Sequence, residues 1–278
     1  MPHRISWGLG AVLYGLVGAL PSMGARAGSD ADWDRCMGDV LDVRIRACTA
    51  LIDAGQLAGQ RLIAAYNNRG NGYQRTGDFD HAIADYTQAI KLSPDSPVPY
   101  NNRGAAYNGK RDYEHAIQDY DKALQLDPSY SAAFNNRGVA YAALGQYDAA
   151  IKDYGRAIAL NAAFAEAYTN RGEAHFHKGN YDQAGLDFTA AIEIDANSTL
   201  ALRDRGLLYL KQDNLDAAIA DFDRALRLTP REPMALYGRG VARRLKGDVP
   251  GADSDIQAAS AAKGDVAQEF EKYGVNGL

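Results

Sequence analysis

The dipeptide Arg-Gly recurs along this chain at a fixed spacing of 34 residues, beginning at 69, 103, 137, 171, 205 and 239. A period of this length is typical of a solenoid, in which each short unit buries its apolar surface against its neighbours. We number the repeat from residue 63, so that Arg and Gly occupy positions 7 and 8. The chain is therefore expected to be a stack of like units.

Apolar residues keep the same period. Alanine fills positions 20 and 27 of all six repeats, and position 24 is aromatic in five of them and Ile256 in the sixth. In the first repeat, residues 79–90 place apolar side chains at i, i+3, i+4 and i+7, which is one face of a helix. Residues 66–73 carry a second apolar stripe, and Thr-Gly-Asp at 76–78 separates the two. Each unit is predicted to be a helix hairpin.

These positions together resemble the tetratricopeptide repeat, a 34-residue helix–turn–helix unit. The resemblance covers residues 63–266 as six tandem repeats. It implies an all-α fold, a right-handed superhelical solenoid of antiparallel helix hairpins whose first helices line a concave face. It also implies that Gly at position 8 and Ala at position 20 let the two helices approach closely. Residues 267–278 are expected to form a C-terminal capping helix and tail.

Aspartate occupies position 23 of every repeat, from Asp85 to Asp255. Six arginines at position 7 matched by six aspartates predict a ladder of ion pairs between the two helices of each hairpin, because the guanidinium group binds a carboxylate through two parallel hydrogen bonds. The alternative is a basic stripe that faces a ligand.

Asparagine recurs at positions 5 and 6, and position 6 lies roughly 200° around the helix from the aromatic position 4. A side-chain amide both donates and accepts, so it can pair with a peptide unit of an extended ligand. The row resembles the asparagine ladder in the repeat superhelix of O-linked N-acetylglucosamine transferase, although nothing here resembles the catalytic domain of that enzyme. We predict peptide binding in the groove; the alternative is a solvated polar face. The predicted peptide-binding residues are Asn67, Asn68, Asn101, Asn102, Asn135, Asn136 and Asn170.

The first 27 residues differ from the rest. A basic start precedes an uncharged apolar run at 5–20, and Ala25-Arg26-Ala27 follows. This is the pattern of a secretory signal peptide with its cleavage site. A membrane anchor is the alternative, but the apolar run is shorter than the ~20 residues that a spanning helix needs. We therefore expect an exported bacterial protein, periplasmic or secreted.

The two cysteines of the chain lie in a degenerate N-terminal repeat, residues 28–62. Cys36 and Cys48 stand one period before Gly70 and Ala82, the positions of closest helix approach that the family resemblance implies. An exported protein favours a disulfide at such a site. Two cysteines without a nearby histidine are too few ligands for a metal site.

The net charge of the chain limits the classes of partner that it can bind. The formal net charge is −5, and removal of residues 1–27 would take away two arginines and no acid. An acidic balance argues against nucleic-acid binding and against docking on anionic lipid. Position 2 carries no lysine, which argues against the dicarboxylate clamp of co-chaperone repeat domains.

No phosphate loop or nucleophile-elbow motif is present, so neither an enzyme nor a cofactor is expected. The predicted function is a non-enzymatic scaffold in the cell envelope that holds an extended peptide or a partner protein in its concave groove. The alternative is a structural assembly factor of an envelope complex that uses its convex face or its ends.

Overall fold

The computed structural model describes residues 26–274, which form fifteen α-helices and no strand. The predicted signal segment lies outside the described residues except for Arg26 and Ala27, which begin the first helix. The helices are α1 (Arg26–Met37), α2 (Leu41–Asp53), α3 (Gly59–Arg75), α4 (Phe79–Leu92), α5 (Pro97–Gly109), α6 (Tyr113–Leu126), α7 (Ser131–Ala143), α8 (Tyr147–Leu160), α9 (Ala165–His177), α10 (Tyr181–Ile194), α11 (Thr199–Lys211), α12 (Leu215–Leu228), α13 (Pro233–Leu245), α14 (Val249–Ala262) and α15 (Val266–Glu271). Seven hairpins, α1–α2 to α13–α14, thus precede one short final helix.

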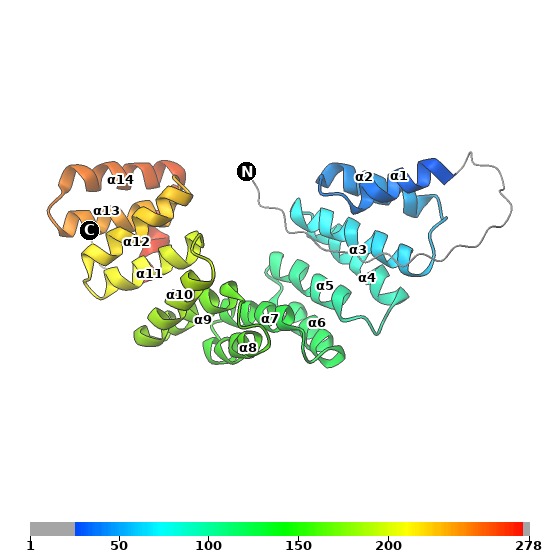
Figure 1. Ribbon diagram of the computed structural model, residues 1–278, viewed down its shortest axis with the longest axis horizontal. Coiled ribbons are helices and arrows are strands. Elements are labelled where there is room, and N and C mark those ends of the chain that lie inside the picture. The colour runs from blue at the N-terminus through cyan, green and yellow to red at the C-terminus, as the bar shows by residue number, and fades with distance from the viewer. Residues whose placement is uncertain (1–25, 275–278) are drawn as a thin grey trace.

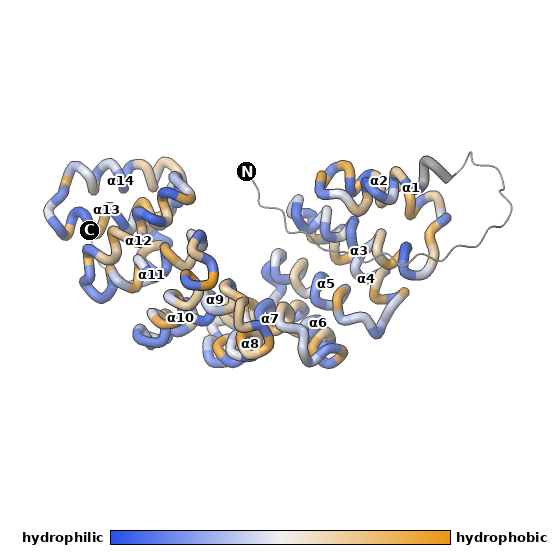
Figure 2. Tube along the Cα trace, in the orientation of Figure 1, coloured by the Kyte–Doolittle hydropathy of each residue, from blue (hydrophilic) through white to orange (hydrophobic). Residues whose placement is uncertain are grey.

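The hairpins follow one another along an open arc, with α1–α2 at one end and α14 at the other (Figure 1). From α3 to α13, each first helix contacts the first helix of the next hairpin, whereas no two second helices contact each other. The stack therefore curves toward the first helices, which form its concave wall. Hydrophobic and hydrophilic residues alternate along the helices (Figure 2), as expected where each helix has a buried and an exposed face.

The turn inside each hairpin follows from a few residues. In the first repeat α3 ends at Arg75, and Gly77 adopts a φ of 82°, a conformation that favours glycine. The amide of Asp78 donates to the carbonyl of Tyr73 at 2.9 Å, which completes a Schellman motif. The Asp78 side chain then accepts from the amide of His81 and caps α4.

The glycine at position 8 accommodates an aromatic ring. A Cβ added at Gly104 would lie 2.8 Å from Cε1 of Tyr120, and the aromatic residue at position 24 stands in the same place in the other repeats up to the fifth. The ring fills the space above the glycine, and Ala116 at position 20 is fully buried beside the ring. Ile256 takes this role at Gly240 in the sixth repeat.

The predicted ladder of ion pairs is confirmed in all six repeats. In each, the Arg Nε and one terminal nitrogen donate to the two carboxylate oxygens at 2.6–2.9 Å. The aspartate side chains are only 6–8% exposed. The position-7 arginines are thus held between the helices of their own hairpins, and they do not form a free basic stripe.

The first hairpin is linked covalently. Cys36 of α1 and Cys48 of α2 form a disulfide with a Cα–Cα distance of 4.8 Å, and both are fully buried. The two cysteines take the closest-approach positions of the hairpin, where later repeats carry glycine and alanine. Since no other cysteine exists in the chain, all its thiols are in this bond.

Candidate peptide-binding groove

Asparagine side chains of neighbouring first helices bond to one another along the concave wall. The Nδ2 of Asn136 on α7 donates to Oδ1 of Asn101 on α5 at 3.1 Å. The Nδ2 of Asn170 on α9 likewise donates to Oδ1 of Asn135 on α7 at 3.0 Å. Each bond joins position 6 of one repeat to position 5 of the repeat before it. These amides therefore fasten adjacent hairpins.

The two central position-5 residues are buried, unlike the other predicted peptide-binding residues. Asn101 is 7% exposed and Asn135 is 1% exposed. Besides its bond to Asn170, Asn135 donates to Oε1 of Glu166 at 3.4 Å. Asn101 accepts from Asn136 of the next hairpin and donates to Asn102 of its own helix, so both buried amides have their hydrogen-bond partners within the protein.

The other predicted residues are partly exposed. Asn136 and Asn170 each use their NH₂ group in the row and keep the Oδ1 atom as an acceptor. Asn102 accepts from Asn101 at 3.4 Å, and Nδ2 of Asn68 lies 3.0 Å from Sδ of Met37 on α1. In the first repeat, Oδ1 of Asn67 is buried without a hydrogen-bond partner in residues 26–274. The wall thus offers carbonyl oxygens more readily than complete amides.

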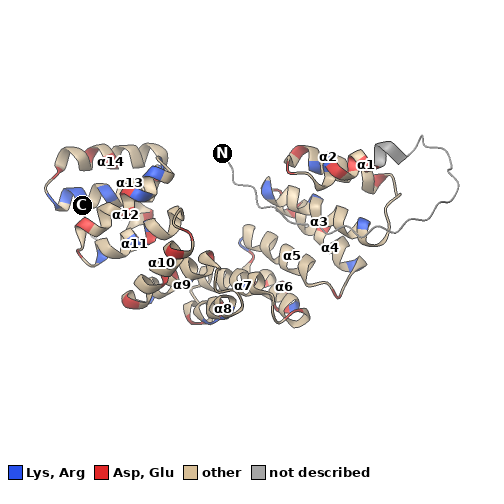
Figure 3. Cartoon of the chain, in the orientation of Figure 1, with Lys and Arg blue, Asp and Glu red and all other residues tan. Residues whose placement is uncertain are grey.

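The row changes chemistry on α11. Position 5 becomes Arg203 and position 6 becomes Asp204, whose Oδ1 accepts from Nε of Arg203 at 2.7 Å. A terminal nitrogen of Arg203 also lies 3.7 Å from Oε1 of Glu232. Burial raises the pKa of Asp204 to about 6, and the neighbouring carboxylates of Glu173 and Glu232 add to this while Arg203 opposes it. A charged cluster replaces the amides in this half of the groove (Figure 3 shows how charges spread over the solenoid).

The C-terminal segment returns across the concave wall. The expected capping helix is α15, which packs on α13 and α14, where the Phe270 ring lies 4.8 Å from that of Tyr237. Tyr273 then reaches α9, with its ring 5.8 Å from those of Phe176 and His177. Burial raises the pKa of Tyr273 above its usual range, and the nearby Asp204 and Glu173 reinforce this. The segment therefore covers the inner wall beside the charged cluster.

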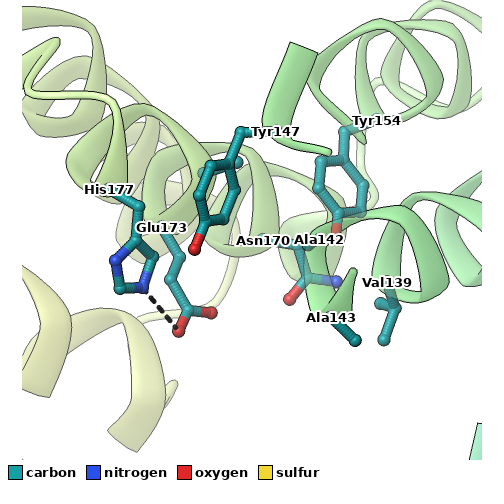
Figure 4. Close-up of a pocket in the computed structure, with 9 residues that line it drawn as sticks. Val139, Ala142, Ala143, Tyr147, Tyr154, Asn170, Glu173 and His177 are labelled. Atoms are coloured by element: carbon teal, nitrogen blue, oxygen red, sulfur yellow. Dashed lines mark ion pairs between the residues drawn. The ribbon is translucent and has the colours of Figure 1, made fainter. Parts of the chain in front are cut away.

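A pocket of about 270 Å³ opens between α7, α8 and α9 (Figure 4). Its lining comes from side chains at positions 6, 9, 10, 12 and 13 of the first helices and from two tyrosines of α8. The lining residues are Val139, Ala142, Ala143, Tyr147, Tyr154, Asn170, Glu173, Ala174 and His177. In this view the Glu173 carboxylate, the His177 ring and the Tyr147 hydroxyl lie close together.

The pocket follows from the residue at position 12. In the first repeat Gln74 fills this place and accepts from the Tyr86 hydroxyl at 3.0 Å. In the fourth repeat Phe176 fills it and is 6% exposed. The third repeat carries Ala142, a small side chain that lines the pocket beside Tyr154. The small residue at this place in the third repeat leaves space that larger side chains fill in the first and fourth repeats.

Within residues 26–274 no three His, Cys, Asp or Glu side chains are grouped to hold a metal ion. Over the same range, no helix combines the length and the apolar character that a bilayer crossing requires.

Family models match the repeats directly. A tetratricopeptide repeat model matches residues 63–96, 97–130 and 165–198, and two further tetratricopeptide repeat models match 119–152 and 203–266. A TPR repeat model matches 138–179. The chain belongs to the tetratricopeptide repeat family. No curated protein sequence matches this tetratricopeptide repeat protein.

Solved structures share its fold. A tetratricopeptide repeat protein from Parabacteroides merdae is 21% identical with a TM-score of 0.69, covering 90% of this chain and 98% of that one. PilF of Pseudomonas aeruginosa is 19% identical with a TM-score of 0.66, over 75% of this chain and 96% of its own. YrrB, described as a TPR protein with an unusual peptide-binding site, is 24% identical with a TM-score of 0.51, over 67% of this chain and 97% of its own.

Sequence reasoning missed two features of the groove of this tetratricopeptide repeat protein. The pocket had a sequence signal, since Ala142 is the smallest residue in the position-12 series, but its significance depends on how α7, α8 and α9 pack around it. The position of Tyr273 against α9 had no sequence signal, because α15 ends at Glu271 and a turn, not a further helical residue, places Tyr273.

Proposed function

We propose that this protein binds an extended segment of a partner protein along its concave wall, with the α7–α9 pocket as the principal contact. The observation that carries the proposal is this pocket, which opens among the first helices beside free acceptor atoms of Asn136 and Asn170. The relationship to YrrB, described as having a peptide-binding site, supports the same use of a repeat surface. The proposal treats the chain as a scaffold without catalytic activity.

We further propose that the protein acts in the bacterial envelope, in the periplasm or outside the cell. The support is the signal-like pattern of residues 1–27 together with the disulfide, since disulfides persist in oxidising compartments. A fusion of residues 1–62 to alkaline phosphatase, which gains activity only after export, tests this location. Absence of phosphatase activity in cells that accumulate the fusion would contradict it.

A second candidate uses the convex face. Leu186 on the second helix α10 is 71% exposed, the highest value among the exposed large apolar side chains of the described residues. A partner covering it would make the protein an assembly factor of an envelope complex that leaves the groove free.

Site-specific photo-crosslinking separates the two candidates. A benzoylphenylalanine placed at Val139 reports on the groove, and the same residue at Leu186 reports on the convex face; both side chains are exposed in the structure. In the cells that make this protein, the proposal predicts a covalent adduct from Val139 and none from Leu186. Adducts from Leu186 alone would establish the second candidate and refute the first.

A further inference from the structure

The polar groups that line the α7–α9 pocket favour a ligand that donates hydrogen bonds. One N–H of Asn170 donates to Asn135, and its Oδ1 remains as an acceptor beside the pocket. The Glu173 side chain is 41% exposed, and its one ion pair within residues 26–274 is a long one, 3.8 Å from Oε1 to Nε2 of His177. A carboxylate and an amide oxygen thus face the same space.

The walls of the pocket suit a flat or elongated cation. Tyr147 borders it with an aromatic ring, a group whose faces attract cations; one face of this ring stacks on His177, with centroids 5.3 Å apart, and Tyr154 beside it is only 2% exposed. Val139 and Ala142 supply an apolar surface on which the methylene groups of a long side chain can pack.

The charged residues around the α7–α9 pocket also favour a cationic ligand. Glu166, Glu173, Asp204 and Glu232 lie along this part of the concave wall, and Arg203 is the cation among them, already bonded to Asp204. Burial raises the pKa of the Tyr154 hydroxyl, and the neighbouring carboxylates of Glu173, Asp153 and Glu166 raise it further. A cation entering the pocket would therefore meet a net negative field.

We propose that the α7–α9 pocket binds an arginine side chain of the partner segment, with its guanidinium group between Tyr147 and the carboxylate of Glu173. Arginine fits better than lysine because its planar group stacks on aromatic rings and donates several hydrogen bonds at once. This inference rests on the proposed use of the concave wall and names the side chain that is recognised there.

The probe for the test is the tripeptide acetyl-Ala-Arg-Ala-amide, compared with the same peptide carrying citrulline, which is neutral and nearly isosteric. Titration of the isotope-labelled protein followed by NMR should give saturable shifts at amides of residues 139–147 and 170–177 with arginine. A partly exposed charge-assisted hydrogen bond predicts binding at least about tenfold weaker for citrulline. Equal affinity for both peptides, or shifts located elsewhere, would overturn the inference.

Two variants and a matched control keep the test specific. Glu173→Gln removes the charge but keeps the shape, and should weaken arginine binding about tenfold. Ala142→Phe should abolish it by filling the pocket with the residue that position 12 carries in the next repeat, where the fold already accepts it. Glu114→Gln makes the same chemical change on the exposed first turn of α6 and should leave binding unaltered. Arginine binding that survives both pocket variants would refute the assignment.

The outcomes separate this inference from the function on which it rests. A crosslink from Val139 together with equal affinity for the arginine and citrulline peptides would support groove binding and refute the recognition of an arginine side chain. If no crosslink formed from Val139 but the pocket still bound the arginine peptide, the proposed function would be refuted and the arginine-binding site would be supported.

Discussion

The ion-pair ladder makes a quantitative prediction for Asp119→Asn in the second repeat. Arg103 contacts the Asp119 carboxylate through two hydrogen bonds of 2.7 Å, and the side chains are 20% and 8% exposed. Exposed pairs contribute about 0.2–1 kcal/mol, whereas removing one partner of a buried pair costs about 3–5 kcal/mol. This pair lies between the two limits, and asparagine keeps one acceptor oxygen. We therefore expect the free energy of unfolding to fall by about 2 kcal/mol.

Urea unfolding followed by far-UV circular dichroism measures this change, with Asp80→Asn as the control. Asp80 forms an ion pair with Lys110, but its side chain is 79% exposed, so the control should leave the unfolding midpoint unchanged. The double variant Arg103→Met/Asp119→Leu should lose less than the sum of the two single changes, because no buried charge is left without its partner. If Asp119→Asn were no more harmful than Asp80→Asn, the ladder would not stabilise the hairpins as argued.

Three further predictions test other parts of the structure. Reducing the disulfide of the first hairpin should cost about 3 kcal/mol locally, seen as loss of hydrogen-exchange protection in α1–α2 with α5–α10 unaffected. Gly104→Ala should lower the free energy of unfolding by about 1–2 kcal/mol through the clash with Tyr120. Gly155→Ala, whose Cβ would make only an ordinary contact of 3.7 Å with a terminal nitrogen of Arg171, should raise it by about 0.5–1 kcal/mol; equal effects would contradict the packing argument. Folding raises the pKa of Asp204 to about 6, so the folded state binds more protons than the unfolded state between about pH 4 and 6. The free energy of unfolding should therefore fall as pH rises through that window, by about 1–3 kcal/mol relative to Asp204→Asn. Parallel pH profiles of the two proteins would refute this.

The repeat unit could be predicted from the sequence because its constraints are local to one hairpin. Position 7 and position 23 sit on facing helices, so the pairing of Arg103 with Asp119 follows from the period alone. The disulfide follows in the same way, since Cys36 and Cys48 take two positions of known proximity within the unit.

Contacts between hairpins were beyond this reasoning. Whether Asn136 points to solvent or to Asn101 depends on the small rotation from one hairpin to the next, which a period does not specify. The helical wheel correctly separated position 6 from the apolar stripe, yet it treated each helix alone. As a result, the sequence analysis assigned Asn101 and Asn135 to a ligand, whereas the structure uses them between helices.

The return of the C-terminal segment gives the two halves of the solenoid different mechanics. Phe270 rests on Tyr237 of α13, Tyr273 on Phe176 of α9, and Lys211 of α11 contacts the carbonyl oxygen of Gly274. A curved stack widens when its inner helices move apart, and here that movement must first break the three contacts of the C-terminal segment with α13, α9 and α11. The curvature of the solenoid from α9 to α13 is therefore fixed by these contacts. The stretch from α3 to α7 has no such contacts among the described residues, so its curvature can adapt to the shape of a bound partner.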